Sequence, residues 1–136
     1  MNNIVILEQE KAKKYIKENC EELTKYLYII EWLKEENVKL YLLFDEDVLK
    51  SFVLLSKLKH DPLRTHMKPY YLNYIYTFEN FRRKGNAFFL TSEIKKEQNI
   101  TVFCVDDMTQ NLFKKAGYIF NDNDPLYNAL PIYRYP

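Results

Sequence analysis

The order of apolar and polar residues predicts a chain that alternates helices with strands. Residues 3–7 form a short β-like run, and residues 8–36 then carry apolar side chains at helical spacing. This second segment is either two short helices with a break near Asn19 or one bent helix, and we expect two. Cys20 lies on the apolar stripe, where a small core residue is more usual than a nucleophile. Trp32 lies beside the stripe and is expected to be partly exposed.

The middle of the chain has the pattern of a β-hairpin and a third strand. Residues 38–44 and 48–58 are strand-like and are joined by the acidic turn at 45–47. The second of these strands is apolar on both faces, which predicts a central strand covered by helices on each side. Residues 60–69 contain two prolines and are expected to be a solvated loop, although an acceptor substrate could also face them. A strand at 70–78 follows.

The stretch YIYTFENFRRKGNAFFL, residues 74–90, changes from strand-like to helical within a few residues. Three consecutive cations, residues 82–84, precede Gly85, and helical spacing of apolar residues begins at Ala87. The start of a helix has unpaired backbone N–H groups and the positive end of the helix dipole, and both favour anions. Glycine allows close approach to the backbone. The pattern therefore predicts a phosphate-binding site.

The last third of the chain continues this alternation. Residues 100–105 form a compact β-branched strand, and the order strand, helix, strand predicts a right-handed crossover with parallel pairing. Asp106 and Asp107 are suitable N-terminal caps for a short amphipathic helix. Gly117 is expected to end this helix in a left-handed conformation.

Composition limits the possible classes of function. The chain has 136 residues, 47% of them hydrophobic, which predicts one domain spanning 1–136. Its formal net charge of +1 counts against nucleic acid as a partner, and no apolar run is long enough for a membrane span. Two cysteines and no recognisable leader predict a cytoplasmic, reduced setting. His60 and His66 have no further metal ligands at a suitable spacing, so no metal site is expected.

Two segments carry a resemblance to a known family. Arg82-x-x-Gly85-x-Ala87 after a strand resembles the pyrophosphate loop of the GCN5-related N-acetyltransferase (GNAT) family. The segment DDMTQNLFKKAGYIF resembles the family's second block, in which a helix ends in Tyr-x-x-x-Gly-Phe. Phe113 stands at the tyrosine position and Gly117 at the glycine position. The resemblance implies an α/β fold with a central mixed sheet, two splayed parallel strands and flanking helices, closed by strands at 119–120 and 130–135.

The same resemblance implies a substrate and the residues that bind it. The acyl donor would be acetyl-CoA, with its pantetheine arm along the strand and its pyrophosphate on the basic loop, for direct transfer to an amine. The implied cofactor-binding residues are Ile75, Tyr76, Thr77, Arg82, Arg83, Lys84, Gly85, Asn86, Ala87 and Phe113. No motif in the sequence specifies the amine acceptor, the acyl chain or the oligomeric state.

The sequence departs from the family pattern at positions that bear on catalysis. Phe113 lacks the hydroxyl of the usual tyrosine acid, Tyr71 replaces the glutamate base of some members, and Asp106 replaces the asparagine before the helix. Asp106 and Cys104 are the nearest candidates for a proton relay or an acceptor contact, although a helix cap and a buried strand residue are the plainer interpretations. A thiolate leaves readily near neutral pH, so these changes weaken acid–base catalysis without excluding transfer.

Three interpretations from different classes remain open. The first is an N-acetyltransferase acting on a primary amine of a small molecule or protein. The second is an acyl-CoA-binding protein with weak or no catalysis, which the change at Phe113 supports. The third is a nucleic-acid or protein interaction module, supported only by the basic turn and the aromatic residues.

Overall fold

The computed structural model describes residues 2–57, 70–96, 100–103, 107–123 and 131–135. The elements run in the order β1 (Asn2–Glu8), α1 (Gln9–Asn19), η1 (Glu21–Lys25), α2 (Leu27–Lys34), β2 (Val38–Asp45), β3 (Val48–Lys57), β4 (Tyr70–Thr77), η2 (Glu79–Phe81), α3 (Asn86–Ile94), β5 (Ile100–Phe103), α4 (Asp107–Lys115), β6 (Ile119–Asn123) and β7 (Pro131–Tyr135). The predicted strands and helices are therefore present in the predicted order. Within these ranges no helix has both the length and the apolar character needed to span a bilayer.

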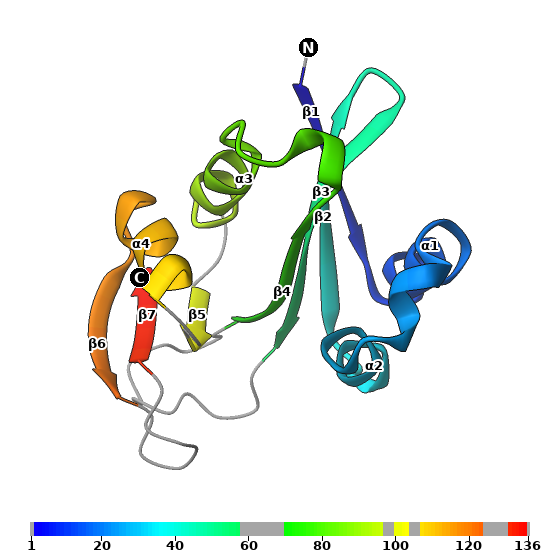
Figure 1. Cartoon of the computed structure of the whole chain (residues 1–136). Helices are drawn as coiled ribbons and strands as arrows, with labels where there is room; N and C mark the ends of the chain where they lie inside the picture. The colour runs from blue at the N-terminus through cyan, green and yellow to red at the C-terminus, as the bar shows by residue number, and fades with distance from the viewer. Residues whose placement is uncertain (1, 58–69, 97–99, 104–106, 124–130, 136) are drawn as a thin grey trace.

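The strands form one mixed sheet in the order β1-β2-β3-β4-β5-β7-β6. The pair β4–β5 is parallel and the other neighbouring pairs are antiparallel, which confirms the predicted parallel pairing. Parallel pairing is confined to Tyr70 with Ile100 and Tyr71 with Thr101, so only the start of β4 pairs with the described part of β5. Figure 1 shows β4 diverging from β5 beyond this point.

A β-bulge in β4 lies immediately after the parallel pairs. Leu54 of β3 pairs with Tyr74 and Leu55 pairs with Leu72, so Asn73 is the extra residue. The bulge shifts the alternation of side chains. Leu72 and Ile75 pack in one core cluster, whereas Tyr74 packs in the other. The alternation of β4 side chains between the two faces of the sheet therefore shifts by one residue at Asn73, close to where β4 separates from β5.

Two hydrophobic clusters cover the two faces of the sheet. One lies between the sheet and helices α3 and α4, and the other lies between the sheet and α1 and α2 (Figure 1). Strand β3 contributes Val53 and Leu55 to the first cluster and Phe52 and Leu54 to the second. The prediction of a central strand covered on both sides is confirmed.

The N-terminal helical segment is divided, as predicted, by the 3₁₀ turn η1 and an extended residue, Tyr26. Cys20 is buried, which confirms its assignment to the core, and this burial raises the pKa of its thiol to about 11. The expectation for Trp32 was wrong. It is fully buried, and its Nε1 donates to the carbonyl oxygen of Leu55 at 2.9 Å. The break at Tyr26 changes the helical phase, so Trp32 faces the sheet and Leu27, placed on the stripe by periodicity, is 66% exposed.

Candidate functional site

The end of β4 is held by buried polar contacts from its neighbour β3. Ser51 Oγ, which is fully buried, donates to the carbonyl oxygen of Tyr76 at 2.7 Å. Its distance to Thr77 Oγ1 is 2.9 Å. A serine hydroxyl has one proton, so Thr77 is the donor in this second hydrogen bond. These bonds fix the strand where the basic turn begins.

Arg82 closes the turn against the strand. Its Nε donates to the carbonyl oxygen of Thr77 at 2.8 Å, and its guanidinium lies 5.5 Å from the centroid of the Tyr76 ring. A guanidinium over an aromatic face gains a cation–π contribution as well as the hydrogen bond. Arg82 is thus tied to the protein, whereas no hydrogen bond or ion pair is found for the exposed side chain of Arg83 within the described residues.

Helix α3 begins with free backbone donors. Gly85 is its N-cap with φ +81°, and no side-chain cap or acidic residue occupies the first turn. Asn86 is buried, and its Nδ2 donates to the carbonyl oxygen of Phe81 at 2.7 Å, which closes the loop under the helix start. A Cβ built on Gly85 would meet no atom within 4 Å, so the space in front of these amides is open. Such a helix start suits an anion.

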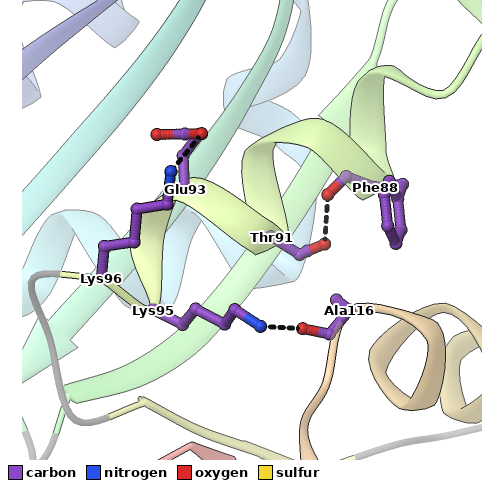
Figure 2. Close-up of polar contacts among 6 residues, drawn as sticks. All are labelled: Phe88, Thr91, Glu93, Lys95, Lys96 and Ala116. Atoms are coloured by element: carbon purple, nitrogen blue, oxygen red, sulfur yellow. Dashed lines mark hydrogen bonds and ion pairs between the residues drawn. The ribbon is translucent and has the colours of Figure 1, made fainter.

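Helices α3 and α4 are joined at their C-terminal ends. Lys95 Nζ donates to the carbonyl oxygen of Ala116 at 2.5 Å, and the Tyr118 hydroxyl donates to the carbonyl oxygen of Thr91 at 3.0 Å. Figure 2 shows Lys95 reaching from α3 to the end of α4, and the Thr91 hydroxyl turned back to the carbonyl of Phe88 in its own helix. A lysine at this position also complements the negative end of the α4 dipole. The spacing of the two helices is therefore fixed.

A cavity of about 940 Å³, the first cavity, opens between these elements. Its walls are residues 74–77 of β4, residues 81–83 and 85–88 of the turn and α3, and Asn111, Leu112 and Lys115 of α4. Arg82, Arg83 and Lys115 carry positive charge, and the described lining residues include no carboxylate. The cavity runs from an aromatic strand to a basic helix start, which suits a long ligand with an anionic group at one end.

Most of the sequence-predicted cofactor residues lie in this wall. Ile75, Tyr76, Thr77, Arg82, Arg83, Gly85, Asn86 and Ala87 all line the first cavity. Lys84 is exposed in the same turn but does not line it. Cys104 and Asp106, the tentative catalytic candidates, lie outside the described residues, as do His60 and His66. Within the described ranges no three His, Cys, Asp or Glu residues could hold a metal ion.

The structure does not bring Phe113 to the cavity, contrary to what the motif implied. Phe113 is fully buried and packs edge-on against Tyr118, with ring centroids 5.0 Å apart. Helix α4 turns Phe113 and Ala116 into the core, and its neighbouring face presents Leu112 and Lys115 to the cavity. In this structure Leu112, and not Phe113, is the apolar α4 residue in the wall.

Sequence reasoning missed several lining residues, which are Tyr74, Phe81, Phe88, Asn111, Leu112 and Lys115. Asn111, Leu112 and Lys115 lie on one face of α4 at helical spacing. The helical period would have identified this face once Phe113 was assigned to the core. Tyr74 had no such signal, because the bulge at Asn73 decides which face it occupies.

The fold that holds this site is that of the GNAT acetyltransferases. No family model and no curated protein matches the sequence. Among solved structures, Arabidopsis thaliana NAA60 in complex with acetyl-CoA is similar over 98% of this chain and 97% of its own, with TM-score 0.60 and 12% identity. The catalytic domain of Tetrahymena GCN5 histone acetyltransferase in complex with coenzyme A is similar over 99% of this chain and 92% of its own, with TM-score 0.61 and 14% identity. The aminoglycoside N-acetyltransferase AAC(6')-Iy in complex with CoA matches over 94% of both chains, with TM-score 0.63 and 11% identity. The predicted fold class is confirmed.

Proposed function

We propose that the protein is an N-acetyltransferase that moves an acetyl group from acetyl-CoA to a primary amine by direct transfer. The observation that carries this proposal is the first cavity, which joins the diverging part of β4 to an uncapped, basic helix start. The fold shared with acetyltransferases bound to acetyl-CoA or CoA supports it.

The start of α3 is the proposed pyrophosphate site. Its free amides and the open space at Gly85 allow an anion to reach the backbone. Arg83, from the turn before α3, and Lys115, from α4, line the same cavity and add positive charge. Arg82 has a different role in this proposal. Because it is bonded to Thr77, it mainly holds the turn in shape and contributes its charge at a distance.

The edge of β4 beyond Tyr71 is the proposed site of the pantetheine arm. The described part of β5 makes no pair with residues 74–77, so an extended chain with amide groups could hydrogen-bond there. The thioester would then lie near the bulge, where a strand amide could stabilise the oxyanion that forms during attack.

Transfer requires an uncharged amine and a good leaving group. The amine nitrogen attacks the thioester carbonyl, the new C–N bond forms, the C–S bond breaks, and the amine proton leaves to water or a base. Tyr74 lines the cavity, and burial, followed by the neighbouring Tyr76, raises the pKa of its phenol. A phenol is protonated near neutral pH, so Tyr74 is a candidate donor to the thiolate, and its raised pKa makes it a weaker acid than an ordinary tyrosine. Cys104 and Asp106 remain proposed members of a proton relay.

A second candidate function is binding of an acyl-CoA with little or no transfer. The absence of a tyrosine at position 113 favours it, because the family's usual acid is missing. Two measurements decide between the candidates. Acetyl-CoA should raise the melting temperature under both, and only the enzyme should release free CoA thiol with an amine panel. Lack of acetyl-CoA binding would sink both candidates.

A further inference from the structure

A second cavity, of about 550 Å³, lies on the α2 side of β4. One wall is α2 and its C-cap, with Leu27, Tyr28 and Glu31 on the helix and Glu35 directly after it. The opposite wall is the end of β3 and the start of β4, with Ser56, Lys57, Tyr71 and Asn73. Figure 1 shows α2 beside this part of the sheet.

Neighbouring residues at the bulge of β4 line the two cavities. Asn73 lines the second cavity, and the next residue, Tyr74, lines the first. Tyr28 belongs to the second cavity and stacks on Tyr74, with ring centroids 5.7 Å apart and an interplanar angle of 11°. One aromatic pair is therefore shared by both walls. A molecule in the second cavity would lie next to the inner end of the first, where the proposed thioester lies.

The second cavity has the opposite charge from the first. Glu31 on α2 and Glu35 at its C-cap both line this cavity. Lys57 is the one cation among the described residues that line the cavity. No ion pair of either glutamate with another described residue is found. The rings of Tyr28 and Tyr71 and the apolar side chain of Leu27 complete the wall, and carboxylates beside aromatic faces suit an ammonium on an apolar chain.

We propose that the second cavity binds the acceptor and that the acceptor is an aliphatic di- or polyamine, an inference that rests on the proposed function. The amine that attacks must be uncharged, and a carboxylate in contact with it would hold it in the charged form. Glu31 and Glu35 therefore bind a second, distal ammonium. The methylene chain lies along Tyr28, and the reactive amine extends past Asn73 to the end of the first cavity.

The test compares two amines of equal chain length, cadaverine and pentylamine, which differ by one terminal amino group. Each is titrated by calorimetry into the protein saturated with CoA, and each is then used as an acceptor with acetyl-CoA. Both amines are charged near neutral pH and can place an ammonium on Glu31 and Glu35, but only cadaverine then has a second amine for the thioester. Its kcat/KM as an acceptor is therefore expected to be at least fivefold that of pentylamine. The double variant Glu31→Gln with Glu35→Gln should remove about fivefold of cadaverine affinity, which is the size of an exposed ion pair. It should leave CoA binding unchanged. The double variant Glu21→Gln with Glu22→Gln, at two exposed glutamates outside both cavities, is the matched control for net charge and should change nothing.

The outcomes separate the two proposals. Loss of acetyl-CoA binding by the parent protein would remove the proposed function itself. Normal CoA binding with equal acceptor kcat/KM for cadaverine and pentylamine, or with a glutamine double variant that binds cadaverine as the parent does, would overturn the diamine inference alone. Transfer to lysine-containing peptides but not to cadaverine or spermidine would also overturn it, in favour of a protein acceptor.

Discussion

The two glycines of this chain offer a matched pair of substitutions for testing the phosphate site. Gly85 and Gly117 both have positive φ, +81° and +90°. Gly85 directly precedes helix α3, and Gly117 lies after the end of helix α4. Alanine in the left-handed region costs roughly 1–2 kcal/mol at either position. Their surroundings differ, because a Cβ on Gly85 meets nothing within 4 Å, whereas one on Gly117 would lie 2.7 Å from Lys95 Nζ.

This difference predicts opposite effects on stability and binding. Gly117→Ala must move Lys95 Nζ, the far end of a flexible side chain, which weakens its hydrogen bond to the carbonyl of Ala116 at a small cost added to the left-handed one. Gly117→Ala should therefore lose somewhat more than the left-handed cost of about 1–2 kcal/mol that Gly85→Ala loses. CoA affinity should show the reverse order. A methyl group in front of the α3 amides should weaken CoA at least tenfold, which is about 1.4 kcal/mol.

Urea unfolding measures the first effect and calorimetric titration with CoA the second, at a temperature where both variants are folded. Gly117→Ala should bind CoA within about twofold of the parent, because its Cβ points to Lys95 and not into the first cavity. Equal CoA affinity for Gly85→Ala and the parent would show that the ligand does not approach this backbone. Larger destabilisation by Gly85→Ala than by Gly117→Ala would refute the reasoning on stability.

Three further predictions concern buried residues. Phe113→Tyr should lower the free energy of unfolding by about 1–3 kcal/mol, because the new hydroxyl enters the core without an evident partner. The same variant should not raise the rate of CoA release. A faster variant would place residue 113 at the thioester. Trp32→Phe leaves the buried carbonyl of Leu55 without its donor and should also cost about 1–3 kcal/mol in urea unfolding, whereas no loss would mean that water replaces the indole. The Cys20 thiol has a pKa of about 11 in the folded protein against an ordinary 9.0. The stability that the buried, protonated thiol contributes is therefore complete below pH 9 and is lost as the pH rises through the folded pKa. Between those values the parent should lose about 2 kcal/mol more stability than Cys20→Ala, and parallel pH profiles would contradict the burial argument.

The sequence predicted the order of elements well because the strands and helices of this chain have clear hydrophobic periods and end at recognisable turn and capping residues. The basic turn, Gly85 and the left-handed end at Gly117 are local features, and the structure has them where the sequence put them. The side of α2 that packs on the sheet was not predictable, since the extended residue Tyr26 resets the helical phase. Trp32 is buried and Leu27 exposed for that reason.

The site was predicted in part for a similar physical reason. The pyrophosphate loop is a contiguous segment, so its residues follow directly from the motif. The wall contributed by α4 depends on how that helix rotates against the core, and the motif alone assigned it to Phe113 instead of Leu112. The second cavity depends on the bulge at Asn73 and on the packing of α2 against β4, and neither has a sequence signature.

The most direct test of the proposed function is the melting temperature of the protein with and without acetyl-CoA. A ligand that binds only the folded state, present at a hundredfold its dissociation constant, adds about 2.7 kcal/mol of stability. For a chain of 136 residues this corresponds to a rise of roughly 10 °C. We expect that rise with millimolar acetyl-CoA, and a much smaller one at the same concentration for Gly85→Ala. An unchanged melting temperature with acetyl-CoA, CoA and longer acyl-CoAs would contradict the assignment of the first cavity as a CoA site.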